Sequence, residues 1–220
     1  MFWEDDDDSS VRAPHDVIDV SFKIKGKTLA WDHADTLRSS LYTLLPWLSE
    51  QKNVGFYISL PMEEGNGWMR DDVAEPTLYL SRRAKLVFRI HASLQDELQQ
   101  LIGQILDLDG HQLEIGASQT KQLAPIDTVY SRHVVTTHDD EQQFLDQIYQ
   151  ELNAMGIKAK KMMCGRIRTI NTENGQVTTR SLMIADIDKD DAILLQKKGL
   201  GKHLHWGCGL FMPFKSIKQV

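Results

Sequence analysis

Strand-like and helix-like stretches follow one another in the same order twice along this chain. The first series opens with apolar and polar residues alternating from Val17, which is typical of a strand with one buried face. A helix-like run follows over residues 31–50, with Asp32 or Asp35 as a candidate cap and Pro46 expected to end or kink it. The series is completed by strand-like runs at 54–61, 77–80, 84–92 and 111–118, and by a second helix-like run at 94–106.

The second series repeats this order. A strand-like run at 125–136 precedes an amphipathic helix at 139–156 that ends in glycine. Two strand-like runs flank Asn174-Gly175, a dipeptide typical of hairpin turns, and a short helix then leads to a last strand at 207–214. Each series is β-α-β-β-α-β, so the sequence predicts an α+β fold of two tandem ferredoxin-like units. We expect the units to span residues 17–118 and 119–220, with the boundary near 116–125.

The composition is that of an ordinary globular protein, with 41% hydrophobic and 25% charged residues. No apolar run approaches the roughly 20 residues that cross a bilayer, so no membrane association is expected. The acidic start "MFWEDDDDSS" lacks the features of a secretory signal, and residues 1–16 are predicted to be a disordered tail. Two cysteines, Cys164 and Cys208, are too few for a disulfide framework and favour a reducing cytoplasm.

Charge is distributed unevenly along the chain. Residues 156–220 hold twelve Lys and Arg against five Asp and Glu, a net charge of +7, which leaves −13 for the rest of a chain whose total is −6. A basic region of this kind can bind an anionic partner whatever the total charge, or it can be a solvated face. Charge alone leaves both interpretations open.

A glycine-rich segment, "GLGKHLHWGCGLF", runs from Gly199 to Phe211. Glycine allows positive φ and close approach of a ligand, and the neighbouring lysine and histidines suit a phosphate chain. The segment follows a helix and lacks Gly-Lys-Ser/Thr, so it is neither a nucleotide P-loop nor a dinucleotide fingerprint. The alternative is a helix stop followed by a bulged strand, and composition does not separate the two.

The stretch "SLMIADIDKDDAILLQKKGLGKHLHWGCGLFMPFK" resembles the C-terminal signature of the Cas6 family, endoribonucleases that cut CRISPR repeat RNA into guide RNAs. That signature is Gly-x-Gly, a short basic stretch and Gly-x-Gly-Leu-Phe, matched here by Gly199, Gly201, Gly207 and Gly209. "MMCGRIRTI" and "DHADTLRSSLYTLLPWL" resemble the same family, closest to its MYXAN subtype. The likeness begins near Val17, and the family's fold is two ferredoxin-like units in tandem.

The resemblance implies RNA cleavage without metal or cofactor, by attack of a 2′-OH that leaves a 2′,3′-cyclic phosphate and a 5′-OH. By the same resemblance the acid–base residue is His33, at the start of the first helix, where a helix N-terminus also favours phosphate. Tyr42 and His203 are further candidates for proton transfer. His203, His205 and Cys208 stand at metal-ligand spacing, but no clear fourth ligand accompanies them, so no zinc site is expected.

The predicted RNA contacts lie in the second unit, where alternating residues of a strand share a face and can form a basic stripe. They are Lys158, Lys160, Lys161, Arg166, Arg168 and Arg180 on or beside the strands, and Gly199, Gly201, Lys202, His205, Gly207 and Gly209 in the glycine-rich segment. CRISPR repeat RNA, the guide RNA made from it and other CRISPR-associated effector subunits are the implied partners. A repeat stem would be recognised mostly by its shape and phosphates.

Three alternatives stay open: a non-catalytic RNA-binding subunit on the same fold, a two-histidine phosphodiesterase, and a purely structural subunit of a larger complex. The aromatic strand signature of the common RNA-binding module is absent. A two-histidine phosphodiesterase needs two His-x-Ser/Thr motifs, and only "HAS" at His91 supplies one. Cleavage of repeat RNA in the presence of EDTA would separate an enzyme from the other possibilities.

Overall fold

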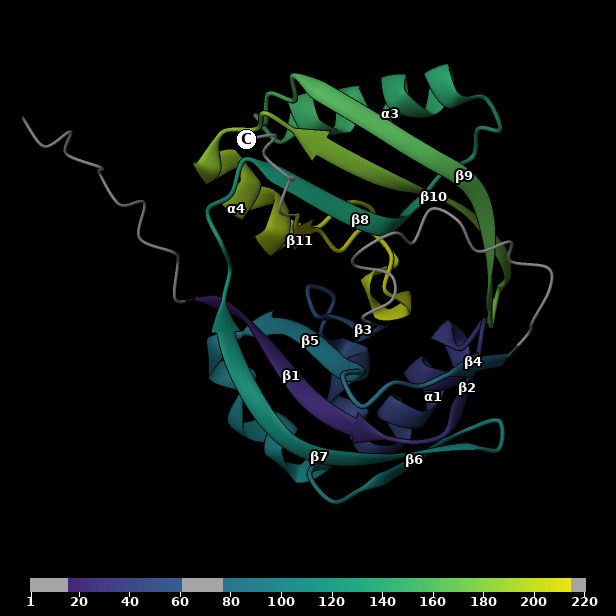
Figure 1. Ribbon diagram of the computed structural model, residues 1–220. Helices are drawn as coiled ribbons and strands as arrows, with labels where there is room; N and C mark the ends of the chain where they lie inside the picture. Colours follow the sequence, from purple (N-terminus) through teal and green to yellow (C-terminus); the bar gives the residue numbers. More distant parts are fainter. Residues whose placement is uncertain (1–15, 61–76, 215–220) are drawn as a thin grey trace, which may run out of the picture.

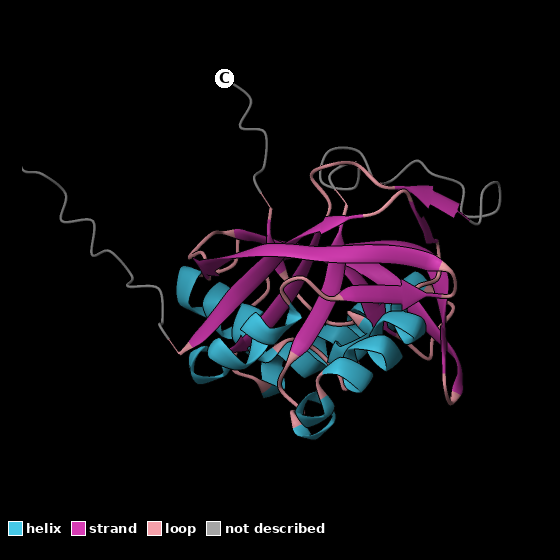
Figure 2. Cartoon of the chain, turned by 90° about the horizontal axis from the view of Figure 1, so that it is seen from below, coloured by secondary structure: helices cyan, strands magenta, loops and turns pink. Residues whose placement is uncertain are grey.

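The computed structural model describes residues 16–60 and 77–214. The predicted loop at 63–72 and residues 1–15 of the predicted tail lie outside this range. The described chain forms two larger antiparallel sheets, of five and four strands, which lie one above the other in Figure 1. Seen from below, helices gather on one side of the molecule and strands on the other (Figure 2). In the described part, no helix is both long and apolar enough to cross a membrane.

The first sheet has the strand order β3-β5-β1-β7-β6. Its strands are β1 (Val17–Lys25), β3 (Gly55–Ser59), β5 (Lys85–His91), β6 (Ile105–Leu108) and β7 (His111–Gln122). Every second residue of β1 from Ile18 to Ile24 is buried, as its alternation predicts. Without β6, the order is that of a ferredoxin-like unit, which confirms the predicted fold. Two short strands, β2 (Thr28–Ala30) and β4 (Thr77–Tyr79), pair with each other.

Helix α1 (Ala34–Leu44) packs its leucines into the core under this sheet. It ends before Pro46, as predicted, and Pro46 begins a 3₁₀ helix that runs to Glu50. The N-cap residue is His33, and its side chain makes no capping hydrogen bond. The prediction that Asp32 or Asp35 caps the helix is wrong, because both carboxylates accept hydrogen bonds from the second unit instead.

The second helix predicted for this unit, over 94–106, is not formed as one helix. Two 3₁₀ helices (Ala92–Leu94 and Asp96–Leu101) are followed by Gly103 at φ +83°, and the chain then enters β6. Strand β6 pairs with β7 as a hairpin and buries its residues at a period of two, not of 3.6. Pairing with β7 therefore overrides the helical pattern in the last four residues of that run.

The second sheet has the order β11-β8-β10-β9 and the same ferredoxin-like topology. Its strands are β8 (Thr128–Val135), β9 (Lys161–Thr172), β10 (Gly175–Ala185) and β11 (Met212–Pro213). The predicted hairpin joins β9 to β10, with Gly175 at φ +108°. Strand β11 is much shorter than the predicted run of 207–214, because Gly207 and Gly209 have φ of +74° and +69° and turn the backbone out of an extended path.

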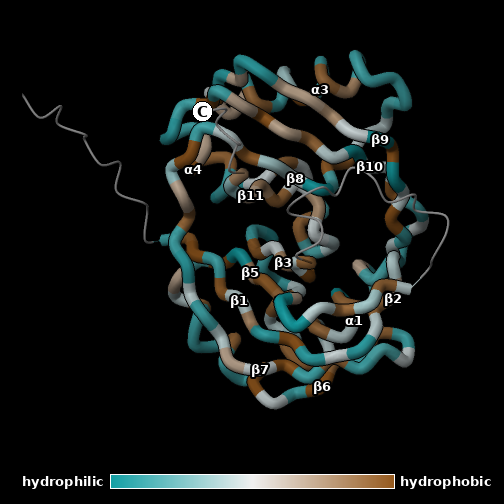
Figure 3. Tube along the Cα trace, in the orientation of Figure 1, coloured by the Kyte–Doolittle hydropathy of each residue, from teal (hydrophilic) through white to brown (hydrophobic). Residues whose placement is uncertain are grey.

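Two helices complete the second unit, α3 (Glu141–Ala154) and α4 (Lys189–Lys198). The carboxylate of Asp140 accepts from the N–H of Gln143 at 2.9 Å and caps α3, and Gly156 follows the helix at φ +80°. Apolar residues of these helices and of the sheet form a core cluster separate from that of the first unit. Figure 3 shows apolar and polar residues alternating along strands of both sheets.

The first sheet extends beyond residue 118, where we expect the first unit to end, but stays within the boundary region expected near 116–125. Strand β7 continues through Gln122, which pairs with Ile18 of β1, so the strand crosses the limit predicted between 118 and 119. Strand β8 then begins the second sheet at Thr128. We propose that the linker between the two units is 123–127.

Candidate functional site

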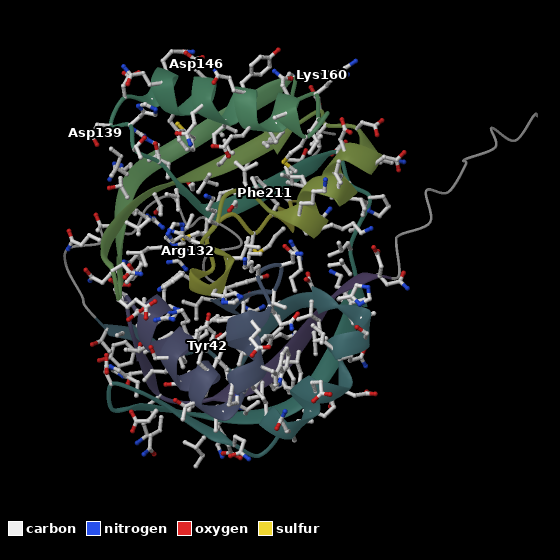
Figure 4. The ribbon with its side chains drawn as sticks, turned by 180° about the vertical axis from the view of Figure 1, so that it is seen from behind. Tyr42, Arg132, Asp139, Asp146, Lys160 and Phe211 are labelled. Carbon is white, nitrogen blue, oxygen red and sulfur yellow. The ribbon has the colours of Figure 1, made fainter. Side chains whose placement is uncertain are left out.

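A cleft of about 780 Å³ opens between the two sheets. Its lining includes Asp19, Ser21, Lys85 and Lys121 from the first sheet, Tyr130, Arg132, His133 and Arg168 from the second, Trp31, Asp32 and His33 before α1, and Trp206 and Gly207 of the glycine-rich segment. Figure 4 places the side chain of Arg132 between the two sheets. Neither unit forms this cleft alone.

His33 lies in the cleft wall at the N-terminus of α1, where the resemblance predicts the acid–base residue. Its Nδ1 lies 2.9 Å from the carbonyl oxygen of Ala30 and 3.2 Å from that of Trp31. A carbonyl only accepts, so Nδ1 carries the proton, and Nε2 of the neutral ring carries a lone pair. Burial, aided by the charge of Arg132, lowers the pKa of His33 to about 4. The ring is therefore neutral at pH 7 and suited to accept a proton.

A second histidine, His133 on β8, lines the same cleft. Its Nδ1 lies 3.0 Å from the hydroxyl of Thr179 on the neighbouring strand β10. Burial lowers its pKa well below the usual value, and the charges of Arg132, Arg168 and His33 add to this effect. The sequence pattern does not single out His133, because it looks like any polar residue in a strand, and only the folded chain brings it to the cleft that His33 lines.

Positive charge and an aromatic ring gather beside the two histidines. The guanidinium of Arg132 lies 5.5 Å from the ring centroid of Trp31, and that of Arg168 lies 5.9 Å from it. Arg168 was predicted from the basic stripe, whereas Arg132 and Trp31 were not. Lys85 and Lys121 add two cations from the opposite wall. The cleft therefore presents positive charge from both sheets to an anionic ligand.

In the glycine-rich segment, backbone atoms of residues near its two ends pack closely on each other. The N–H of Leu200 donates to the carbonyl of Gly209 at 2.9 Å, and a Cβ on Gly209 would lie 1.8 Å from the carbonyl oxygen of Leu200. A Cβ on Gly199 would lie 2.8 Å from the carbonyl oxygen of Gly209. The N–H of Gly209 also donates to the carbonyl of His133 at 2.6 Å, so this segment holds the backbone of a cleft residue. Of its four glycines, Gly207 lines the cleft.

Tyr42 and His205 form a pair away from His33. The hydroxyl of Tyr42 is hydrogen-bonded to Nδ1 of His205, whose Nε2 donates to the carbonyl of Gln51 at 2.8 Å. The ring of His205 stacks on Phe56 of the first sheet, with ring centroids 5.4 Å apart. His205 reaches the cleft lining, but Tyr42 does not. This pair joins the glycine-rich segment to α1, which suits an interface contact better than proton transfer to a ligand in the cleft.

Other predicted residues of the segment lie outside the cleft lining. The ring of His203 packs near Trp206 at 5.6 Å between centroids, and Lys202 and Gly201 are exposed. Burial raises the pKa of the Cys208 thiol to about 12, which disfavours the thiolate that binds zinc. Within 16–60 and 77–214, no group of three His, Cys, Asp or Glu side chains is arranged to hold a metal ion.

The predicted basic stripe is divided by the fold. Arg168 lines the cleft, and Arg166 is exposed on the same strand. Lys158 and Lys160 precede β9, Lys161 begins it, and Figure 4 shows Lys160 at the outer edge of the second unit. Arg180 is 8% exposed and donates to the carbonyl oxygens of Gly165 and Asp139, so its guanidinium is used in hydrogen bonds within the second unit.

Comparison with solved structures places this architecture among known folds. A structure described as a CRISPR associated protein Cas6 aligns with a TM-score of 0.59 at 10% identity, covering 90% of this chain and 100% of that one. A Cas6-related protein from Pyrococcus furiosus aligns with a TM-score of 0.59 at 11% identity, covering 89% and 97%. The CRISPR endoribonuclease Cse3 bound to a 19-nucleotide RNA aligns at 0.52 and 12% identity, covering 90% and 100%. At these identities the likeness concerns the fold.

Sequence comparison adds the family. A protein described as CRISPR-associated endonuclease Cas6 of Myxococcus xanthus (strain DK1622) is 27% identical over 197 residues, covering 89% of this chain and 81% of that protein. The model of the family described as Cas6 Crispr matches residues 18–216, which includes both sheets and the glycine-rich segment. With a match over nearly its whole length, the chain belongs to the Cas6 family.

Proposed function

We propose that this protein is a metal-independent endoribonuclease that cleaves CRISPR repeat RNA in the precursor transcript and so yields guide RNAs. The observation that carries the proposal is the place of His33: a neutral histidine at a helix N-terminus, in a cleft with arginines and lysines on its walls. Membership of the Cas6 family and the similar endonuclease of Myxococcus xanthus support the substrate class. The RNA bound to the similarly folded Cse3 also supports it.

In the proposed reaction the 2′-OH upstream of the scissile phosphate attacks phosphorus. The O2′–P bond forms, the P–O5′ bond breaks, and the products are a 2′,3′-cyclic phosphate and a 5′-OH. Nε2 of His33 is suited to accept the proton of the 2′-OH, because its Nδ1 is held as a donor and its ring is neutral. Arg132, Arg168 and the N-terminal end of α1 would stabilise the extra negative charge of the phosphorane.

The proposal also includes RNA and other CRISPR-associated subunits as partners, and the cytoplasm as the location. The cleft offers Trp31 as an aromatic face for a base and cations for the backbone, which suits RNA. We propose that the protein then stays on the guide RNA within a complex with other CRISPR-associated subunits. Its two cysteines are unpaired and buried, which agrees with a reducing cytoplasm.

A non-catalytic RNA-binding subunit of such a complex is the competing function. It would need the basic cleft but not a neutral histidine with a fixed tautomer at the helix N-terminus. Cleavage by the purified chain therefore decides between the two.

The test is cleavage of repeat RNA by wild type and His33→Ala, with His91→Ala as a matched histidine control outside the cleft lining. His33→Ala should slow cleavage by about 10²-fold or more and leave binding of uncut RNA nearly unchanged. Wild type should keep its activity in EDTA and leave a 2′,3′-cyclic phosphate on the upstream product. A 3′-OH product, a requirement for added metal, or full activity of His33→Ala would contradict the proposed site.

A further inference from the structure

We infer that His133 is the second member of the acid–base pair, acting with His33 on the same phosphate from the opposite unit. The inference rests on the proposed function, since it assigns a further catalytic residue to that reaction. Cleavage by attack of a 2′-OH moves two protons: one leaves the nucleophile and one reaches the leaving 5′-oxygen. His33 alone serves one of these transfers at a time, so the cleft needs a second group.

Nδ1 of His133 is hydrogen-bonded to Thr179, which leaves Nε2 without this partner. The hydroxyl of Thr179 donates its own proton to the carbonyl oxygen of Arg168 at 3.3 Å. Nδ1 of His133 lies 3.0 Å from the same hydroxyl, and when Thr179 donates to Arg168 it accepts from this nitrogen. This leaves Nε2 of the neutral ring to exchange a proton with a substrate.

The two histidines thus have matching arrangements, although they come from different units. In each ring Nδ1 is tied to the protein, by the carbonyl of Ala30 for His33 and by Thr179 for His133. Both residues line the one cleft, so a ligand bound there can reach both rings. In in-line displacement the attacking and leaving oxygens lie on opposite sides of phosphorus. One Nε2 would accept the proton of the 2′-OH, and the other ring, protonated from solvent once the anionic phosphate is bound beside it, would give its Nε2 proton to the leaving 5′-oxygen.

The backbone of His133 is also held in place. Its carbonyl accepts from the N–H of Gly209 at 2.6 Å and from the hydroxyl of Ser131 at 3.3 Å. Gly209 packs so closely on the backbone of Leu200 that a Cβ would not fit there, and this packing places the N–H that supports His133. Positive charge beside the pair comes from Arg132 and Arg168, and a bound phosphate would compensate it.

The first part of the test is single-turnover cleavage and RNA binding by His133→Asn. Asparagine can keep a donor near Thr179 but has no nitrogen that exchanges protons, so it separates chemistry from folding. We expect cleavage to slow by about 10²-fold or more with the affinity for uncut RNA nearly unchanged. Wild-type cleavage rates, or a loss of affinity as large as the loss of rate, would overturn the inference.

The second part uses RNA in which sulfur replaces the leaving 5′-oxygen, since a thiolate leaves without a proton donor. This substrate should restore cleavage by one variant of the pair, His33→Ala or His133→Asn, namely the one that lacks the acid. Restoration of neither or of both would overturn the inference. If His33→Ala is slow and His133→Asn is normal, the proposed function stands and this inference fails; if the wild type does not cut at all, the proposed function fails first.

Discussion

Arg89 and Asp19 face each other across the neighbouring strands β5 and β1, and two hydrogen bonds of 2.8 Å join guanidinium and carboxylate. Arg89 is only 2% exposed, and it also donates to the carbonyl oxygens of Gln196 and Phe211. One side chain of the first sheet therefore holds the end of α4 and the residue before β11. This contact fixes the glycine-rich segment, which lies between those two points, against the first unit.

Arg89→Met should lower the free energy of unfolding by about 3–5 kcal/mol, because it leaves a partly buried carboxylate and two carbonyl oxygens without their donor. The matched control is Lys25→Met, which breaks an ion pair with Glu114 whose side chains are 86% and 57% exposed. That control should cost less than about 1 kcal/mol. Urea unfolding measures both, and similar losses for the two variants would contradict a structural role for Arg89.

Gly209→Ala should be far more destabilising than Gly201→Ala, although both glycines have positive φ. The φ of +79° at Gly201 costs a side chain about 1–2 kcal/mol, and a Cβ there meets no atom within 4 Å. A Cβ on Gly209 would lie 1.8 Å from the carbonyl oxygen of Leu200, so the backbone must move. We expect a loss of more than about 4 kcal/mol, or failure to fold. Equal unfolding midpoints for the two variants would be incompatible with this packing.

The free energy of unfolding should fall as the pH falls from about 6.5 to about 4, in part because of His33. In the unfolded chain this residue takes up a proton near pH 6.5, whereas the pKa of His33 in the folded protein is about 4. Its contribution is complete above pH 6.5 and is lost on acidification, by at most about 3 kcal/mol. The lowered pKa of His133 acts in the same direction. Unfolding of His33→Asn across this range should show a shallower pH dependence than wild type; identical curves would contradict the prediction.

Arg132→Ala and Arg168→Ala should each weaken binding of repeat RNA and lower the slope of log affinity against log salt by about one. The reason is that both cations line the cleft in which we place the RNA. Lys160→Ala removes the same charge at the outer edge of the second unit and should leave the slope nearly unchanged. A salt titration with uncut RNA measures this, and an equal drop for Lys160→Ala would place RNA along the edge predicted from the basic stripe.

The order of elements was predictable because it depends on local patterns. The hairpin at Asn174-Gly175 and the helix that ends in Gly156 follow from residues close in sequence, and both are confirmed. The prediction of one helix over 94–106 is wrong because the last residues of this run pair with β7, and helical periodicity carries no information on pairing with a distant strand. The prediction that Asp32 or Asp35 caps α1 is wrong for a similar reason, since the hydrogen-bond partners of both carboxylates lie in the second unit.

The sequence indicated only part of the candidate site. The family resemblance singles out His33 and the basic stripe singles out Arg168, and both line the cleft, whereas His133, Arg132 and Trp31 carry no sequence signal of their own. Their shared position results from the packing of two sheets about a hundred residues apart in the chain. Lys160 and Arg180 look alike in sequence, but Lys160 is exposed, whereas Arg180 is buried and bonded to the carbonyl oxygens of Gly165 and Asp139.

The length of the β9–β10 hairpin determines where its tip contacts the turn that carries His33. Asn171 donates its N–H and its side-chain amide to Asp32 at 2.9 and 2.6 Å, and Glu173 binds Arg38 at 2.6 Å, so the tip holds both flanks of that turn. Two more residues in each strand would keep every side chain on its face but carry the tip about 7 Å further out. The contacts that hold this turn, and with it His33, therefore depend on the number of residues in the hairpin as well as on their identity.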